Sequence, residues 1–146
     1  MGWSGGRRVL VALALVYLAG LAVLVAGPWG WALNRLTVAC YVQLRYDWPI
    51  APDWVLPEHY GVLLNVLLFV PLGALLVLLT ARAGWIAVLT AVLVAAAGST
   101  AIEVVQGVFL AREATWQDVA ANTVGAAIGA LAVSPLRLRA PRSPRQ

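Results

Sequence analysis

Long apolar runs are the feature that most limits what this chain can fold into. Three of them, Val9 to Gly27, Gly61 to Thr80 and Trp85 to Leu110, match the stretch of about 20 residues that a helix needs to cross a membrane. A fourth segment, Gln117 to Pro135, has a similar length but lower hydrophobicity. Because a helix satisfies its own backbone hydrogen bonds inside lipid, we predict an all-α fold with four transmembrane helices in the bilayer.

The composition supports a membrane protein. Charged residues make up 11% of the chain and hydrophobic residues 62%, whereas soluble domains contain about 25% charged residues. The first apolar run exceeds the roughly 7 to 15 residues of a signal-peptide core, and Gly27-Pro28-Trp29 is a poor cleavage site. We expect an uncleaved first span, one helical bundle over residues 1–136, and a disordered Arg- and Pro-rich tail over residues 137–146.

The positions of the arginines predict the orientation. The net charge of +4 comes without any lysine, and four spans would place most arginines on one side of the membrane. The positive-inside rule assigns that side to the cytoplasm, so we expect both termini and the turn at residues 81–84 there. No helical arginine stripe or aromatic stacking pattern accompanies the charge, so we predict no nucleic-acid partner. The expected cytoplasmic set is Arg7, Arg8, Arg82, Arg137, Arg139, Arg142 and Arg145.

Aromatic residues are concentrated between residues 28 and 60. Because Trp and Tyr favour the membrane interface, this external loop is expected to lie there. Trp31 to Tyr46 could form a short interfacial helix, although Thr37 to Val42 would also suit a strand. In the helical interpretation, one face carries Leu33, Leu36, Cys40 and Leu44.

Few residues of the kind that carry cofactor or metal chemistry are present. Cys40 is the only cysteine, so the chain can form neither an internal disulfide nor a thiolate metal cluster. His59 is the only histidine and falls in the external loop. Ser99 has a carboxylate four residues later but no histidine nearby, which argues against nucleophilic catalysis. We therefore predict no cofactor and no metal site.

Polar residues interrupt the last two spans between residues 99 and 129. Polar groups are costly in hydrocarbon unless they are partnered, so each of them needs a reason. In the predicted topology the third helix runs outward and the fourth runs inward, and Asn65 lies near the outer start of the second. All of these residues would then reach one depth near the outer leaflet. The candidate ligand-binding residues are Asn65, Glu103, Gln106, Arg112, Asp118 and Asn122.

Residue spacing predicts which helix faces pack. Separations of three and four residues put side chains on one face of a helix, and three such stripes occur. The Gly125 and Gly129 pair permits close helix approach, and Pro71 is expected to kink the second span. We assign structural roles to Pro71, Gly73, Gly125 and Gly129. The stripes are Asn65, Phe69 and Gly73; Ser99, Glu103 and Gln106; and Asp118, Asn122, Gly125 and Gly129.

A purely structural role for the polar residues is the main alternative. Glu103 and Asp118 could pair with Arg112, while the three amide side chains hold helices together by hydrogen bonds. Such bonds average under about 1 kcal/mol in membranes. Two carboxylates, an arginine and three amides at one depth are more than the packing of four helices needs, so we favour an outward-facing functional site.

Several motifs occur together in a fixed order. They are NVLLFVPLG at residues 65–73, Glu103 and Gln106 in E-x-x-Q spacing, Arg112, and QDVAANTVGAAIG at residues 117–129. This set resembles the VanZ-like family of small bacterial multi-pass membrane proteins, whose founding member is associated with resistance to the glycopeptide antibiotic teicoplanin. The resemblance implies a bacterial plasma-membrane location. Thr115 departs from it, because an aspartate is common there, which puts in doubt any metal site or acid pair that relies on that carboxylate.

Three functions are compatible with the residues and the resemblance. In the favoured one, the polar cluster binds or modulates an envelope component such as the headgroup of a lipid-linked cell-wall precursor, with Arg112 contacting phosphate or carboxylate groups. In the second, an intramembrane enzyme acts on such a precursor, with Glu103 or Asp118 as general base and Arg112 stabilising negative charge. The third is a small oligomeric transporter. The bilayer is the expected partner in all three, and the oligomeric state stays open.

Overall fold

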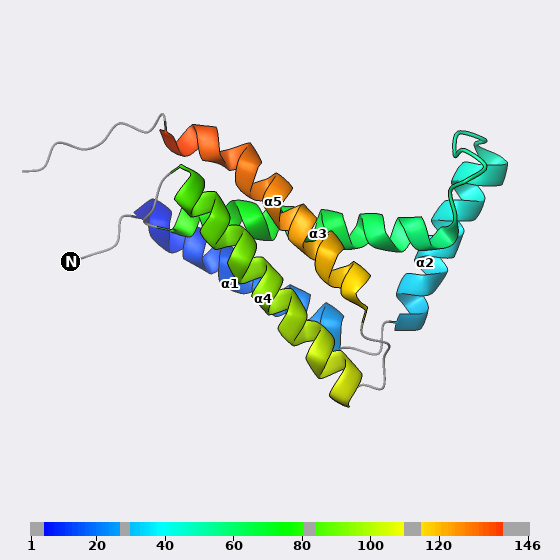
Figure 1. Cartoon of the computed structure of the whole chain (residues 1–146), viewed down its shortest axis with the longest axis horizontal. Helices are drawn as coiled ribbons and strands as arrows, with labels where there is room; N and C mark the ends of the chain where they lie inside the picture. Colours follow the sequence, from blue (N-terminus) through cyan, green and yellow to red (C-terminus); the bar gives the residue numbers. More distant parts are fainter. Residues whose placement is uncertain (1–4, 27–29, 81–83, 110–114, 139–146) are drawn as a thin grey trace, which may run out of the picture.

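In the described part of the chain, every regular element is a helix. The computed structural model describes residues 5–26, 30–80, 84–109 and 115–138 (Figure 1). The predicted all-α class is confirmed, and the alternative of a strand at Thr37 to Val42 is wrong because these residues are helical. Most of the tail that was expected to be disordered lies outside the described residues, and so does most of the turn at residues 81–84. The elements are α1 (Gly5–Ala26), α2 (Gly30–Val42), the π-helix η1 (Gln43–Asp47), α3 (Pro57–Leu79), α4 (Trp85–Phe109) and α5 (Trp116–Leu138).

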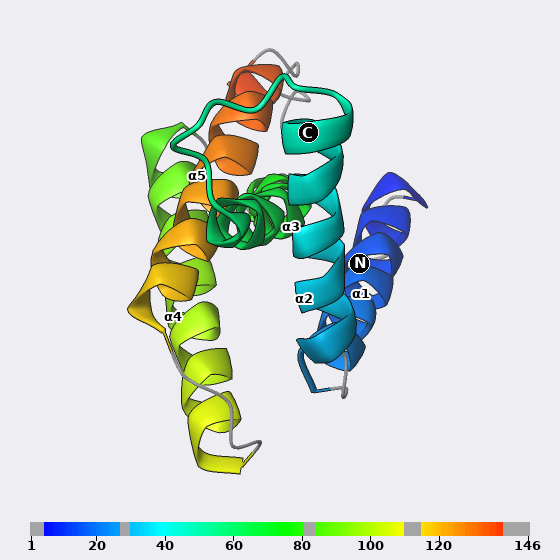
Figure 2. The ribbon, with the colours of Figure 1, turned by 90° about the vertical axis from the view of Figure 1, so that its right-hand side faces the viewer.

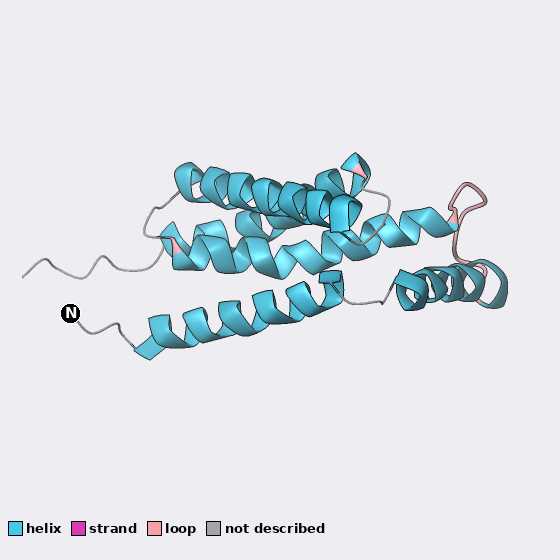
Figure 3. Cartoon of the chain, turned by 90° about the horizontal axis from the view of Figure 1, so that it is seen from below, coloured by secondary structure: helices cyan, strands magenta, loops and turns pink. Residues whose placement is uncertain are grey.

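Helix α3 is the centre of the bundle. It contacts α1, α2, α4 and α5, and its most extensive packing is against α5. Figure 2, in which α3 is seen nearly end-on, shows α4 and α5 on one side of it and α1 and α2 on the other. Figure 3 shows α1 separated from the α4–α5 pair by α3. The four long helices alternate in direction, so that α1 begins and α5 ends on the same side of the bundle (Figure 1).

Glycines bring α3 and α5 into backbone contact. A Cβ atom added to Gly129 would overlap the carbonyl oxygen of Val70, and one added to Gly125 would overlap that of Val66. From the other helix, a Cβ atom on Gly73 would overlap the backbone of Ala126. Only glycine permits this approach, which is the packing that small residues allow in membranes.

Small apolar side chains fill the interior around this contact. One buried cluster combines Val77 of α3 with residues of α4 and α5, and another joins Leu21 of α1 to Phe69 of α3. Alanines supply at least half of the buried residues in each cluster, so the helices are close together with little side-chain volume between them. The buried cluster residues are Leu21, Phe69, Val77, Ala87, Val88, Ala91, Ala95, Ala126 and Ala130.

A hydrogen bond fastens α1 to α3 just before Pro71. The Tyr17 hydroxyl donates to the backbone carbonyl of Leu68. Pro71 lies inside α3 and has no N–H to donate to the carbonyl one turn earlier. The carbonyl that Pro71 leaves without its usual donor is that of Leu67, which precedes the carbonyl that Tyr17 binds.

Three helices in the described chain are long and apolar enough to cross a membrane. They are α1 over Gly5–Leu24, α3 and α4, and many of their large apolar side chains are exposed, as expected of surfaces that face lipid. The predicted count of four spans is not confirmed by this criterion. Helix α5 has the length, with 23 residues, but its polar and small residues lower its average hydropathy.

The segment before α3 forms a helix with one irregular turn. Helix α2 continues directly into η1, which matches the extent predicted from Trp31 to Tyr46. Within the protein, Thr37 is its buried residue and lies 4.0 Å from a Cβ position on Gly61, whereas Leu36 on the predicted apolar face is exposed. Thr37 can be buried because its hydroxyl donates to the carbonyl oxygen of Asn34 at 2.8 Å.

Aromatic and charged contacts fold the chain back from η1 to α3. The Tyr41 ring meets those of Tyr46 and Tyr60 edge to face, at centroid distances of 6.0 and 6.4 Å. A hydrogen bond to the Tyr46 side chain raises the pKa of the Tyr41 phenol above its usual value. Arg45 forms an ion pair with Asp53 and donates to the carbonyl oxygen of Ala51 at 3.2 Å.

Candidate functional site

A hydrogen bond joins two of the candidate site residues across the α3–α5 contact. Asn65, in α3, donates from Nδ2 to the Asp118 Oδ1 atom at 2.7 Å. Asp118 belongs to the first turn of α5, where the helix dipole favours a negative charge. Separated by 53 positions in sequence, the two residues are held together by the glycine contacts farther along the same helices.

Glu103 binds the start of α5 from the neighbouring helix. It is buried in α4, with 7% of its surface exposed, and its Oε2 atom accepts a hydrogen bond from the Thr115 backbone N–H at 2.9 Å. The Thr115 hydroxyl in turn accepts from the Asp118 backbone N–H at 3.2 Å. Thr115 is thus the N-cap of α5, and both carboxylates lie at one helix N-terminus.

The structure gives Thr115 a capping role. Aspartate and threonine are both good N-cap residues, because either side chain can accept a hydrogen bond from the second or third N–H of the helix. The T-x-x-D spacing of Thr115 and Asp118 resembles a capping-box pattern and could have been identified in the sequence. A threonine here keeps the start of α5 in place without supplying a third acid.

A third polar contact lies deeper, between α4 and α5. Asn122 donates from Nδ2 to the Ser99 hydroxyl oxygen at 2.7 Å. Asn122 is 6% exposed and Ser99 is fully buried. The Asn122 Oδ1 atom has no hydrogen-bond partner, although a buried polar atom without a partner costs about 1–3 kcal/mol. This atom is the unsatisfied polar group of the cluster.

Two candidate residues remain, Gln106 and Arg112. Gln106 is buried in α4, less than one turn beyond Glu103. Arg112 lies outside the described residues, so its expected pairing with the carboxylates stays a prediction. The structure therefore brings Asn65 to Asp118 and Glu103 to the cap of α5, with Asn122 one turn below. Among the described residues, no group of three or more His, Cys, Asp or Glu side chains is placed to share a metal ion.

His59 has a structural role away from this cluster. Its Nδ1 atom accepts a hydrogen bond from the Leu56 backbone N–H at 2.8 Å, at the point where Pro57 starts α3. The Ser99 hydroxyl is meanwhile engaged by Asn122. These contacts agree with the sequence argument against a serine–histidine nucleophile.

The comparisons with known proteins extend the match beyond the motifs found in the sequence. The family model described as VanZ/LLP1 matches residues 11–137, which include most of α1 as well as the polar cluster. The chain belongs to the VanZ/LLP1 family. Neither the curated proteins nor the solved structures gave a match. VanZ/LLP1 membership and three spanning-type helices indicate a bacterial membrane protein in a bilayer, related to glycopeptide resistance at the level of the family.

Proposed function

We propose that this VanZ/LLP1 protein binds or modulates a cell-envelope component at the outer leaflet of the plasma membrane. The polar cluster of Asn65, Glu103, Gln106, Asp118 and Asn122, with Arg112 in the adjoining segment, is the proposed binding site. The headgroup of a lipid-linked cell-wall precursor is a ligand of suitable chemistry, and interference with teicoplanin action would be the cellular consequence. Four spans with both termini in the cytoplasm would place this cluster near the external surface.

The unsatisfied Asn122 Oδ1 atom carries the proposal. A cluster that serves only to pack helices gains from pairing every buried polar atom, and here one is left without a partner. The carboxylate oxygens nearby are also hydrogen-bond acceptors. The site therefore favours a ligand with several donors, such as sugar hydroxyls or amide N–H groups.

The alternatives receive less support. General-base catalysis would need a carboxylate free to take a proton, and both Glu103 and Asp118 are engaged at the start of α5. A transport pathway would need polar groups near the midplane, whereas these lie in the end turns of α4 and α5. Neither alternative accounts for a buried amide oxygen without a partner.

The test separates ligand binding from packing. In a strain that lacks its own copy, we would express the wild-type protein, Arg112→Ala, Glu103→Gln and Asn122→Leu, and measure both membrane abundance and susceptibility to teicoplanin. We expect each variant to reach normal abundance and to lose the drug phenotype. Because Asn122→Leu alone would leave the buried Ser99 hydroxyl without its donor, it is combined with Ser99→Ala, since replacing both partners of a hydrogen bond by apolar groups costs little stability.

Thr123→Val is the matched control for Asn122→Leu. The Thr123 hydroxyl donates to the Val119 carbonyl oxygen within α5 at 2.7 Å, so the control removes a neighbouring polar group without touching the cluster. It should preserve both abundance and phenotype. Loss of phenotype only in proportion to loss of abundance would favour the packing role, and a deletion strain with unchanged drug susceptibility would remove the link to resistance.

A further inference from the structure

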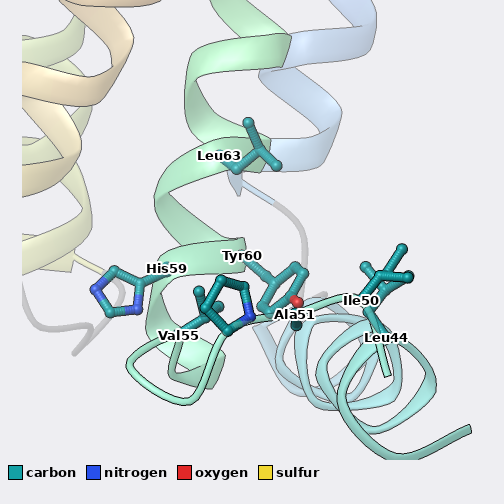
Figure 4. Close-up of a pocket in the computed structure, with 8 residues that line it drawn as sticks. Leu44, Ile50, Ala51, Val55, His59, Tyr60 and Leu63 are labelled. Atoms are coloured by element: carbon teal, nitrogen blue, oxygen red, sulfur yellow. The ribbon is translucent and has the colours of Figure 1, made fainter. Parts of the chain in front are cut away.

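A separate pocket of about 260 Å³ lies between the loop after η1 and the first turns of α3. Figure 4 shows its lining side chains, which come from η1, the loop and α3. Most of the walls are apolar, and His59 and Tyr60 are the two residues with polar side-chain atoms. The lining residues are Leu44, Ile50, Ala51, Pro52, Val55, His59, Tyr60 and Leu63.

Polar contacts hold the walls of the pocket in place. Arg45 binds both the Ala51 carbonyl oxygen and the Asp53 carboxylate, which fixes the loop that forms one wall. His59 accepts a hydrogen bond from Leu56, which fixes the other wall at the start of α3. Because Nδ1 is the acceptor, the neutral ring carries its proton on Nε2. His59 can therefore donate one hydrogen bond from that atom.

The pocket adjoins the lipid-facing side of α3. Leu63, which lines it, is 50% exposed, and Leu67, one turn further along, is 55% exposed. Pro71 continues the same row at a spacing of four residues and is also exposed. Since α3 is one of the spanning-type helices, this row leads from the pocket into the hydrocarbon region.

Aromatic side chains place the pocket at the membrane interface. Trp48 and Trp54 flank the loop and are 62% and 71% exposed, respectively. Trp and Tyr concentrate where the headgroups meet the acyl chains. A cavity at that depth would meet the glycerol end of the bilayer lipids.

We propose that this pocket binds the upper acyl chain of a bilayer phospholipid, with the chain continuing along the row of Leu63, Leu67 and Pro71. The His59 Nε2–H group is the donor for an ester carbonyl of the lipid. This site is distinct from the polar cluster, because Leu63 and Asn65 are two positions apart and therefore point to opposite sides of α3. The bound lipid would hold the interfacial loop against the spanning helix.

The experiment uses the full chain in phospholipid nanodiscs that contain a trace of a phospholipid with a photoactivatable acyl chain. After illumination, the cross-linked peptides are quantified by mass spectrometry. We expect enrichment on the 48–63 segment over the lipid-facing surface of α4. Ala51→Phe fills the pocket and should lower that enrichment about tenfold, the loss expected when roughly two methylene groups can no longer be buried.

Ala101→Phe is the matched control, because Ala101 is exposed on α4 and the change adds the same ring outside the pocket. It should leave the cross-links on residues 48–63 unchanged. Ala51→Leu, a smaller filling, should give an intermediate loss if Ala51→Phe proves unstable. Equal labelling of both segments, or an Ala51→Leu variant that labels like wild type, would overturn the lipid site. Asn122→Leu should not alter these cross-links, so the lipid site and the proposed function can fail independently.

Discussion

At the scale of single residues, Thr115 caps α5 and also links it to α4. Thr115 accepts the Asp118 N–H with its side chain and gives its own N–H to Glu103. It therefore connects α4 to α5 through groups on both its side chain and its backbone. Only the hydrogen bond to its side chain depends on which residue stands at position 115, because any residue except proline supplies the backbone N–H.

Replacing Thr115 by alanine should lower the free energy of unfolding by about 1 kcal/mol, the usual cost of losing an N-cap side chain. Thr115→Asp should preserve the cap, so its free energy of unfolding should stay within a few tenths of a kcal/mol of the wild-type value. Unfolding of the purified protein in detergent would measure both. If alanine and aspartate were equally destabilising, Thr115 would not act as a cap.

The Asn65–Asp118 hydrogen bond should show as a coupling between the two side chains. In a double-mutant cycle with Asn65→Ala and Asp118→Ala, we expect a coupling energy of about 0.5–1.5 kcal/mol, the range for hydrogen bonds between membrane helices. The measurement is the unfolding free energy of the four proteins in one detergent. Strictly additive effects would mean that the two residues act separately.

At the scale of helices, the contact between α3 and α5 depends on the glycines that line it. Each overlap that a Cβ atom would create involves backbone, which cannot move aside as a flexible side chain can. The helices would have to separate, and the polar contacts between Asn65 and Asp118 would separate with them. The glycine stripe therefore positions the candidate site as well as stabilising the bundle.

Gly129→Ala should destabilise the protein by about 1–3 kcal/mol, the typical cost of adding volume to a packed interior. Gly98→Ala is the matched control, because a Cβ atom there meets nothing within 4 Å. It should stabilise α4 by about 0.5–1 kcal/mol, since alanine is a better helix former than glycine. Thermal unfolding of the two variants would reveal the difference, and equal effects would contradict the close approach at Gly129.

The spacing of residues along the predicted helices anticipated several of these contacts. It could not predict contacts that depend on how one helix is rotated against another. Asn65 and Asp118 were expected at one depth because adjacent antiparallel helices bring their ends together, and they are hydrogen-bonded. The Tyr17–Leu68 contact could not be predicted, because it depends on how α1 is rotated against α3. The burial of Thr37 could not be predicted either, because a threonine with a local hydrogen bond can pack like an apolar residue.

At the scale of the whole molecule, the number of spans depends on α5. Its average hydropathy falls below that of the other long helices because most of its polar and small residues face α3 and α4. Beyond Trp116 at its start, its exposed large apolar residues are Val124, Ile128 and Leu131, spaced by four and three positions and therefore on one face. An average hydropathy combines the side of a helix that faces protein with the side that faces lipid, whereas only the lipid-facing side must be apolar. A fourth span through α5 therefore stays a prediction.

A fourth span would put the C-terminus on the same side as the N-terminus, in the cytoplasm. Fused at the C-terminus, green fluorescent protein should therefore fluoresce and alkaline phosphatase should be inactive, because the first folds in the cytoplasm and the second needs the oxidising periplasm to form its disulfides. A phosphatase fused after residue 109, where α4 ends, should be active and serves as the control. An active phosphatase at the C-terminus would mean that α5 does not cross the bilayer, and the cytoplasmic position proposed for that end would be wrong.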